Sequence, residues 1–164
     1  MEQDPAFAFR ILVDVAIKAL SPAINDPTTA VTAIEQIHQL LHDLGRQPLY
    51  AGKYRDAAGR VRLEVRTPTW EDYLSLAVDE IRQYGSTSVQ VARRLRAMLE
   101  DLLETLPEAR RPAVRQELDL IARAIEGSFP EAEDRVRAQV ADLQGIGASR
   151  DAAHRRPVPP AGRS

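Results

Sequence analysis

The run PAFAFRILVDVAIKAL constrains the fold more than any other segment of this chain. Proline fits the first position of a helix, so the run predicts a helix from Pro5 to Leu20. Its charged residues Arg10, Asp14 and Lys18 are four apart and therefore share one narrow stripe. A helix that is apolar over the rest of its surface must be covered, so it is either the central helix of the domain or a surface for another chain. It is shorter than the roughly 17–25 residues of a membrane-spanning helix.

A polar junction with two prolines, SPAINDPTT, follows this helix. Ser21-Pro22 ends the helix, because proline lacks a donor and disfavours a helical residue before it. Asp26 is a typical N-cap and Pro27 fits the first helical position, so a second helix begins here and runs to a glycine cap at Gly45. The apolar spacing of this helix predicts one inward face, formed by Ala30, Ile34, Ile37, Leu41 and Leu44.

A β-hairpin is predicted next, near residues 48–66. In the segment RVRLEVR, Val61, Leu63 and Val65 alternate with charged residues, which is the pattern of a half-buried strand. The segment PLYAGKY is a weaker strand and would pair with it across the turn RDAAG.

Four more helices follow the hairpin. Thr69 caps the third helix, with Asp72 three positions later as an imperfect capping box, and the others begin near residues 88, 112 and 130. The side chains predicted to point inward are Trp70, Leu74, Ala77, Ile81 and Tyr84, then Val91, Leu95, Met98, Leu102 and Leu106, then Val114, Leu118, Ile121 and Ile125, and finally Val136, Val140 and Leu143.

These elements predict a mainly α fold, a bundle of about six helices with one inserted β-hairpin. We assign residues 1–146 to this domain and residues 147–164, which have no apolar period, to a disordered tail. With 164 residues the chain is long enough to bury a core. The absence of cysteine excludes disulfides and thiolate metal sites, and the net charge of −2 gives no overall attraction to nucleic acid.

The junction is the first candidate site. The backbone N–H groups of Thr28, Thr29 and Ala30 are expected to be free donors at a helix N-terminus, which suits an anion. The simpler interpretation, which we favour, is a proline-locked corner, because Asp26 already supplies a negative cap and no glycine-rich loop is present. The candidate ligand-binding residues are Ser21, Asn25, Asp26, Thr28, Thr29, Arg82 and Tyr84.

A weak metal candidate lies on the second helix, where Glu35, His38 and His42 share one face. Glu-x-x-His is half of a di-iron carboxylate pattern, but the second copy that such a site requires is missing. The HExxH order of zinc proteases is missing as well. We therefore interpret this face as solvated and expect no metal and no cofactor.

No catalytic pattern stands out. The sequence has no Ser-His-Asp order with a nucleophile elbow, no P-loop and no GxGxxG, so we favour a non-enzymatic protein. Arg93, Arg94 and Arg96 are interspersed with acidic residues and predict a mixed-charge surface and no nucleic-acid partner. The segment IRQYG, with Arg82 and Tyr84, is equally explained by a helix C-terminus with a basic last turn and a glycine cap.

Three segments, EQDPAFAFRILVDVAIKALSPAINDPTTAV, IHQLLHDL and DYLSLAVDEIRQYG, resemble the soluble C-terminal portion of DUF2254, a bacterial family of predicted membrane proteins with no assigned activity. The likeness covers Glu2 to Leu143. The family's junction motif matches Ser21, Pro22, Ile24, Asn25, Asp26, Pro27, Thr29 and Ala30. Ala23 stands where glycine is common in the family, which argues against a left-handed turn at that position. The resemblance implies that several transmembrane helices precede this domain in family members, whereas this chain begins near the QDPAF element.

Two functional hypotheses follow. The first is an uncharacterised, non-enzymatic domain for assembly or sensing beside the membrane part of a longer parent protein. Its first helix would contact the parent's membrane helices or a second copy of the chain. The alternative is a ligand-binding or hydrolytic domain with its site at the junction of Ser21 to Thr29. We expect the parent protein in the cell membrane and this chain, taken alone, to be soluble and cytoplasmic.

Overall fold

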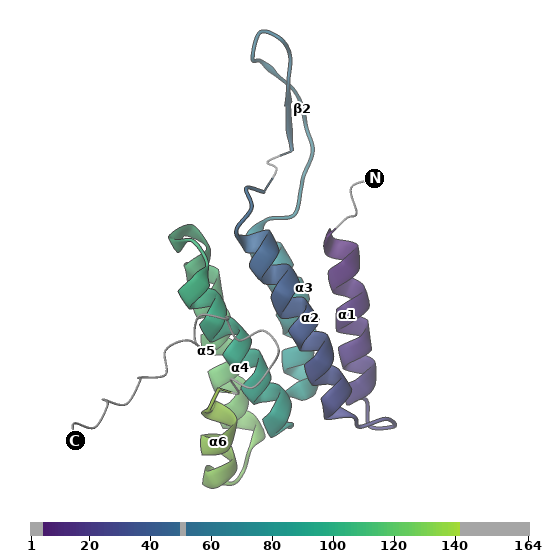
Figure 1. Cartoon of the computed structure of the whole chain (residues 1–164), viewed down its shortest axis with the longest axis vertical. Coiled ribbons are helices and arrows are strands. Elements are labelled where there is room, and N and C mark those ends of the chain that lie inside the picture. Colours follow the sequence, from purple (N-terminus) through teal and green to yellow (C-terminus); the bar gives the residue numbers. More distant parts are fainter. Residues whose placement is uncertain (1–4, 50–51, 142–164) are drawn as a thin grey trace, which may run out of the picture.

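The computed structural model describes residues 5–49 and 52–141, which form a bundle of six helices with one β-hairpin (Figure 1). The helices are α1 Pro5–Leu20, α2 Pro27–Gly45, α3 Trp70–Gly85, α4 Val89–Thr105, α5 Arg111–Ser128 and α6 Ala132–Gln139, with a short 3-10 turn, η1, at Glu108–Arg110. The strands are β1 Lys53–Arg55 and β2 Val61–Glu64. The predicted fold class is confirmed. The predicted tail at residues 147–164 lies outside the described residues.

Helices α1 to α5 alternate in direction along the long axis of the bundle (Figure 1). Helix α1 packs against α2 and α3, while α2 contacts α4, α3 contacts α5, and α6 packs against α4 and α5. Because its neighbours lie on one side only, α1 occupies an edge of the bundle. Of the two roles predicted for it, the central helix is therefore wrong. Within the described part of the chain, none of the helices is long and apolar enough to cross a membrane.

Trp70 anchors the start of α3 in the core. Its ring is fully buried, and its indole N–H donates to the carbonyl oxygen of Arg110 over 3.1 Å. The Arg110 guanidinium lies 5.7 Å from the centre of the same ring. The polar end of the tryptophan is therefore satisfied inside the protein, as a buried indole requires. The other large side chains that are fully buried are Phe9, Ile34, Ile37, Leu41, Leu74, Ile81, Leu95, Met98, Leu99, Leu102 and Leu106.

The predicted helix caps are formed by local hydrogen bonds. The amide of Asp72 donates to the Thr69 hydroxyl over 3.2 Å, and the amide of Thr69 donates to the Asp72 carboxylate over 2.8 Å. Both bonds of a capping box are present, although aspartate is shorter than the usual glutamate. Donation by Thr69 holds the pKa of Asp72 below its ordinary value. Ser88 caps α4 by accepting from the amide of Val91.

The glycines at the ends of α2 and α3 do not act as left-handed caps, because neither has a positive φ. A Cβ added at Gly85 would lie 2.4 Å from Cγ1 of Val91, and one added at Gly45 would lie 2.8 Å from the Leu106 methyl groups. Gly85 therefore allows the close approach of the stiff Val91 side chain, whereas Gly45 packs against the flexible end of Leu106. The helix ends were predicted correctly, but the predicted role of these glycines as left-handed caps is wrong.

The expectation of a half-buried hairpin is wrong. Strands β1 and β2 pair antiparallel, with Tyr54 opposite Leu63, but both strands are exposed along their whole length. Val61, Leu63 and Val65 retain 43, 55 and 45% of their surface. The physical reason is that the hairpin projects away from the bundle, so no helix lies against its apolar side (Figure 1). The strands are also shorter than predicted, and residues 50–51 of the predicted first strand lie outside the described residues.

Three side chains predicted to point inward are exposed instead. Tyr84, Val136 and Val140 retain 57, 63 and 54% of their surface. Helix α6 is only eight residues long and buries Ala138 rather than Val136, and it ends before Val140. Leu143 and the expected helix end at Gly145 lie outside the described residues. The inward residues predicted for α4 are all buried.

Candidate functional site

Several polar groups of the junction between α1 and α2 are satisfied by hydrogen bonds to neighbouring residues. The Ser21 hydroxyl donates to the carbonyl of Lys18 over 2.8 Å. The amides of Ile24 and Asn25 donate to the carbonyl of Ser21, and the amide of Asp26 donates to the carbonyl of Ala19 over 2.8 Å. Carbonyl groups at the end of α1 therefore find donors within the next six residues, which is how a helix end avoids unpaired acceptors.

Asp26 caps the start of α2 with both carboxylate oxygens. Oδ1 accepts from the amide of Thr29 over 3.1 Å, and Oδ2 accepts from the Thr29 hydroxyl over 2.5 Å. The amide of Ala30 donates to the carbonyl of Asp26. Donation by the Thr29 side chain and backbone holds the pKa of Asp26 below its ordinary value of 3.8. The expectation of free donors at Thr29 and Ala30 is wrong, because Asp26 accepts from both.

Asn25 is the left-handed residue of the junction, with φ of 46°. Asparagine tolerates this conformation better than other residues that carry a Cβ. Ala23, the position where the family commonly has glycine, does not have a positive φ. Asn25 therefore supplies the turn that the corner needs.

The candidate residues on α3 lie at the same end of the bundle as the junction (Figure 1). A Cβ added at Gly85 would lie 3.3 Å from Leu20, so the C-terminal ends of α1 and α3 are adjacent. The Arg82 guanidinium donates to Asp79 over 3.0 Å, and Tyr84 is 57% exposed. Within the described residues, no hydrogen bond or ion pair joins either side chain to residues 21–29. The junction site stays a prediction.

A buried polar cluster lies between α2 and α4, where the sequence predicted a solvated face. His38 and Glu35 are 3 and 7% exposed, and Arg94 from α4 is 2% exposed. Nε2 of His38 is 2.9 Å from Oδ2 of Asp101, and Nδ1 of His38 is 3.3 Å from Nη2 of Arg94. Two expectations are therefore wrong: His38 and Glu35 do not face solvent, and Arg94 is not part of a surface.

The contacts of His38 fix its tautomer. A guanidinium only donates hydrogen bonds, so Nδ1 of His38 must accept from Arg94. The proton then resides on Nε2 and is donated to Asp101. Both ring nitrogens are occupied by this arrangement, so neither is free to bind a metal or to activate a nucleophile. The cluster is suited to holding α2 against α4.

His42 does not join this cluster. The His42 side chain is 29% exposed, and its Nδ1 lies 3.6 Å from Oδ1 of Asp43. In residues 5–49 and 52–141, no three His, Cys, Asp or Glu side chains lie close enough together to hold a metal ion.

A further buried charged residue, Glu117 on α5, was not predicted from the sequence. Glu117 is 5% exposed and faces Asp79 and Arg82 on α3. Burial raises its pKa above the ordinary 4.5, and the nearby Asp79 raises it further, while Arg82 acts in the opposite direction. Its Oε2 has no hydrogen-bond partner among the described residues.

The signal for these buried charges was their helical position. Arg94 lies three residues after Val91 and four before Met98, which are both buried. Glu117 lies at the same offsets from Val114 and Ile121. A charged residue at these offsets lies on the inward face of its helix.

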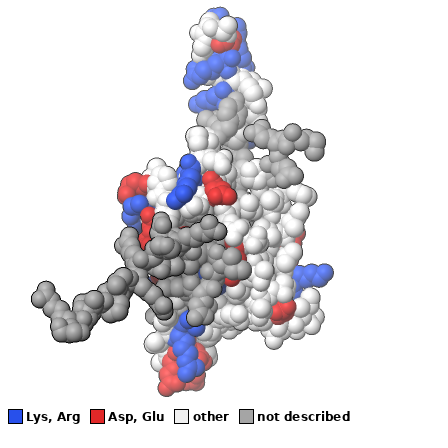
Figure 2. All heavy atoms as spheres, viewed as in Figure 1, with Lys and Arg blue, Asp and Glu red and all other residues white. Residues whose placement is uncertain are grey.

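The outer face of α1 carries an exposed apolar stripe, defined by Phe7, Ile11 and Val15. They retain 65, 47 and 43% of their surface and are spaced by four residues, so they line one side of the helix. Three charged residues border the stripe, because each follows one of its members by three positions in the sequence. They are Arg10, Asp14 and Lys18. Figure 2 shows few charged side chains over this side of the bundle.

The comparison with known proteins adds a family to this description. A family model described as "Predicted membrane protein (DUF2254)" matches residues 1–101. The chain belongs to the DUF2254 family. The resemblance found in the junction motif is thereby confirmed. The family description names a membrane protein but states no activity.

Relatives of this DUF2254 chain occur in mycobacteria. The uncharacterized proteins Mb1321c of Mycobacterium bovis and Rv1290c of Mycobacterium tuberculosis are each 32% identical to it over 136 residues. The match covers 82% of this chain but only 26% of each relative, so the chain spans about a quarter of their length. No solved structure matches the chain.

Proposed function

We propose that this chain is an extramembrane domain of a longer membrane protein, with a non-enzymatic role in assembly or sensing, and that α1 docks it on the membrane part. The observation that carries the proposal is the apolar stripe of Phe7, Ile11 and Val15. Apolar patches rimmed by polar side chains are typical of interaction sites. Full burial of side chains of this kind contributes about 1.5–3 kcal/mol each, so covering three that are half exposed is a substantial driving force.

The occupant we propose for the stripe is an apolar helix of the parent's membrane part. Two findings support this choice: the family is described as a predicted membrane protein, and the relatives are about four times as long as the match. The exposed fraction of the stripe is highest at Phe7, near the end of the bundle where α1 begins. Any segment that precedes α1 in a longer chain enters at that end.

Detergent binding and self-association of the purified chain test the docking surface. We expect the chain to bind dodecyl maltoside micelles or to self-associate in sedimentation velocity, and the double variant Phe7→Gln/Ile11→Gln to do neither. The matched control is Val136→Gln/Val140→Gln, which removes two comparably exposed apolar side chains, one in α6 and one just after it, and should change nothing. If the unmutated chain stays monomeric and binds no detergent, the proposal is contradicted.

Crosslinking in cells then identifies the occupant. In the complete gene product, a photo-reactive residue in place of Ile11 should crosslink to the membrane part of the same polypeptide. A product of twice the mass would instead assign the stripe to self-association. The intact mass and the membrane fractionation of the native product test the proposed cell-membrane location. Protease protection in oriented vesicles tests the proposed cytoplasmic side.

The alternative, a ligand-binding or hydrolytic site at the junction, has less support. The side chains of Ser21 and Asp26 form hydrogen bonds with neighbouring backbone and hydroxyl groups, as expected of a capped helix corner. Variants of Asp26 test the junction independently of α1.

A further inference from the structure

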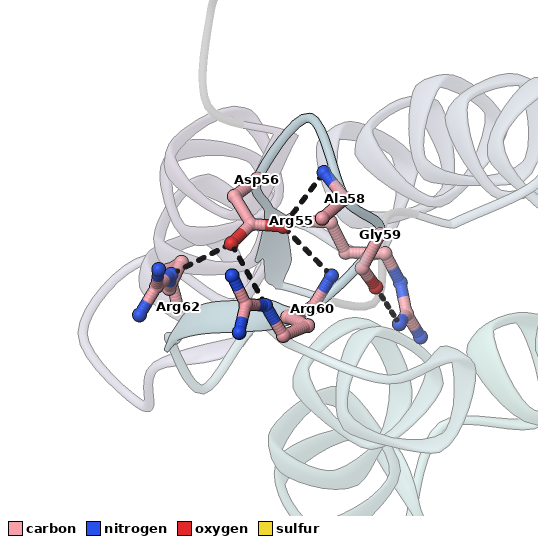
Figure 3. Close-up of polar contacts among 6 residues, drawn as sticks. All are labelled: Arg55, Asp56, Ala58, Gly59, Arg60 and Arg62. Atoms are coloured by element: carbon pink, nitrogen blue, oxygen red, sulfur yellow. Dashed lines mark hydrogen bonds and ion pairs between the residues drawn. The ribbon is translucent and has the colours of Figure 1, made fainter.

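The hairpin of β1 and β2 is a structured projection without a core of its own. A two-stranded hairpin is at best marginally stable in water, so its turn must be held by other contacts. Asp56 supplies them: Oδ1 accepts from the amides of Ala58 and Arg60 over 3.0 and 2.9 Å, and Oδ2 accepts from Nε of Arg62 over 2.8 Å (Figure 3). The Arg55 guanidinium donates to the carbonyl of Gly59 over 2.8 Å. The turn is therefore ordered by polar bonds while both strands remain exposed.

The two faces of the hairpin differ in chemistry. Tyr54 lies opposite Leu63, so these two share a face with Val65, which is two positions after Leu63. Val61 is paired with Arg55 beyond a register shift, so it is exposed but does not extend this face. Tyr54 is 53% exposed, and the other three retain similar fractions. Charged side chains, including the Lys53–Glu64 pair at 3.4 Å, occupy the positions between them. The hairpin is thus amphipathic, with an apolar face that nothing in the bundle covers.

The hairpin is also strongly basic. Residues 53–66 contain five basic side chains and two acidic ones, Asp56 and Glu64, which gives a net charge of +3 in a chain whose net charge is −2. Figure 2 shows the basic side chains gathered at the projecting end of the molecule. The five basic residues are Lys53, Arg55, Arg60, Arg62 and Arg66. Positive charge is therefore concentrated on the hairpin, which extends beyond the bundle.

We propose that the β1–β2 hairpin is a membrane-surface contact that binds anionic phospholipid headgroups and inserts its apolar face into the headgroup boundary. Basic side chains bind lipid phosphates while their aliphatic stems lie along apolar surface, and exposed apolar side chains enter the interface. The hairpin extends from the end of the bundle where α1 begins (Figure 1), so a membrane at that end would meet it first. The membrane setting agrees with the family description, but the inference does not require the proposed docking of α1.

An anionic lipid surface fits these observations better than nucleic acid does. Phosphate binding alone would use the arginines but leave Val61, Leu63 and Val65 in water. Single-stranded nucleic acid is usually bound with several aromatic side chains for stacking, and among residues 52–66 the hairpin offers only Tyr54. A lipid interface satisfies the basic and the apolar positions at once.

Vesicle co-sedimentation of the full chain tests the proposal. We expect binding to phosphatidylcholine vesicles that contain phosphatidylglycerol, and none to phosphatidylcholine alone. The variant Lys53→Gln/Arg66→Gln leaves the Asp56 turn intact and should weaken binding by about 30-fold, from roughly fivefold for each basic residue near an anionic surface. The matched control Arg115→Gln/Arg123→Gln makes the same change in charge on α5 and should bind as the parent chain does.

A reporter on the hairpin shows whether the apolar face inserts. In Tyr54→Trp, we expect the added tryptophan to shift its emission to shorter wavelength with anionic vesicles, while the buried Trp70 does not respond. Val61→Thr/Leu63→Thr, which keeps β propensity, should bind more weakly without loss of helicity. Absence of vesicle binding, equal weakening by the α5 control, or binding to RNA in place of vesicles would each overturn the proposal. None of these results bears on α1, whose test uses other residues and detergent.

Discussion

Removal of His38 is the sharpest test of the cluster that joins α2 and α4. In His38→Leu, the imidazole is replaced by an apolar side chain of similar size, so little cavity is created. Two hydrogen bonds are lost, to the Asp101 carboxylate at 2.9 Å and from the Arg94 guanidinium at 3.3 Å. Hydrogen bonds to charged groups contribute about 1.5–3 kcal/mol each. Because the Asp101 side chain is 17% exposed, water can replace part of its loss, so we expect a decrease in the free energy of unfolding of about 3 kcal/mol.

The matched variant is His38→Gln. Its amide nitrogen can donate to Asp101 and its amide oxygen can accept from Arg94, which are the roles of Nε2 and Nδ1 in the native tautomer. We therefore expect a loss of about 1 kcal/mol or less. Urea unfolding followed by far-UV circular dichroism measures both variants, provided that the slope of the transition is unchanged.

A double-mutant cycle shows whether the cluster acts as one unit. Arg94→Met alone removes a guanidinium that is 2% exposed and takes a donor away from His38. The double variant with His38→Leu should lose less than the sum of the two single losses, because it leaves no unpaired histidine or arginine behind. If His38→Leu is as stable as the unmutated chain, or if His38→Gln is no more stable than His38→Leu, then the hydrogen bonds do not hold these helices together and the reasoning is refuted.

Three further predictions concern Asp26 at the junction, the buried Glu117 and Gly85. Asp26→Ala should lower the urea midpoint at neutral pH more than Asp26→Asn, which can still cap but carries no charge; a ligand-induced melting shift lost in both would instead indicate a site. Because the folded pKa of Asp26 is lowered, its stabilising contribution is present above about pH 3.8 and is lost on acidification, so Asp26→Asn should show a smaller acid loss in pH-dependent urea unfolding. The pKa of Glu117 is raised, so the parent chain should lose stability as pH rises from 4.5, and Glu117→Gln should gain relative to it only above that pH; a pH-independent difference would contradict this. Gly85→Ala should cost about 1–3 kcal/mol in urea unfolding, because its Cβ would lie 2.4 Å from the stiff side chain of Val91; an unchanged midpoint would show that α4 moves aside freely.

The helix boundaries were predictable because their causes are local. Pro5 and Pro27 occupy first helical positions, and Asp26 and Thr69 accept from amides three residues later, as each segment's own sequence indicated. Such bonds form within one turn and depend little on what lies next to the helix. The order of elements and the fold class followed from these boundaries.

Side-chain exposure was less predictable, because it depends on which element lies against a face. His38 was expected in solvent, yet α4 lies against it and supplies Arg94. The alternation of the hairpin resembles that of a half-buried strand, yet no helix reaches Leu63. A period of two or of 3.6 residues identifies faces but not their neighbours.

The sequence by itself determined that this chain forms capped amphipathic helices around a proline-locked corner and that α1 has more apolar surface than one neighbour can cover. Only the tertiary structure decided which part of that surface stays exposed. Because α2 and α3 both pack on one side of α1, Phe9 and Val13 are buried, while Phe7 and Ile11 remain in contact with solvent. Helix packing, which joins residues far apart in the chain, thus created the surface on which the proposed function depends.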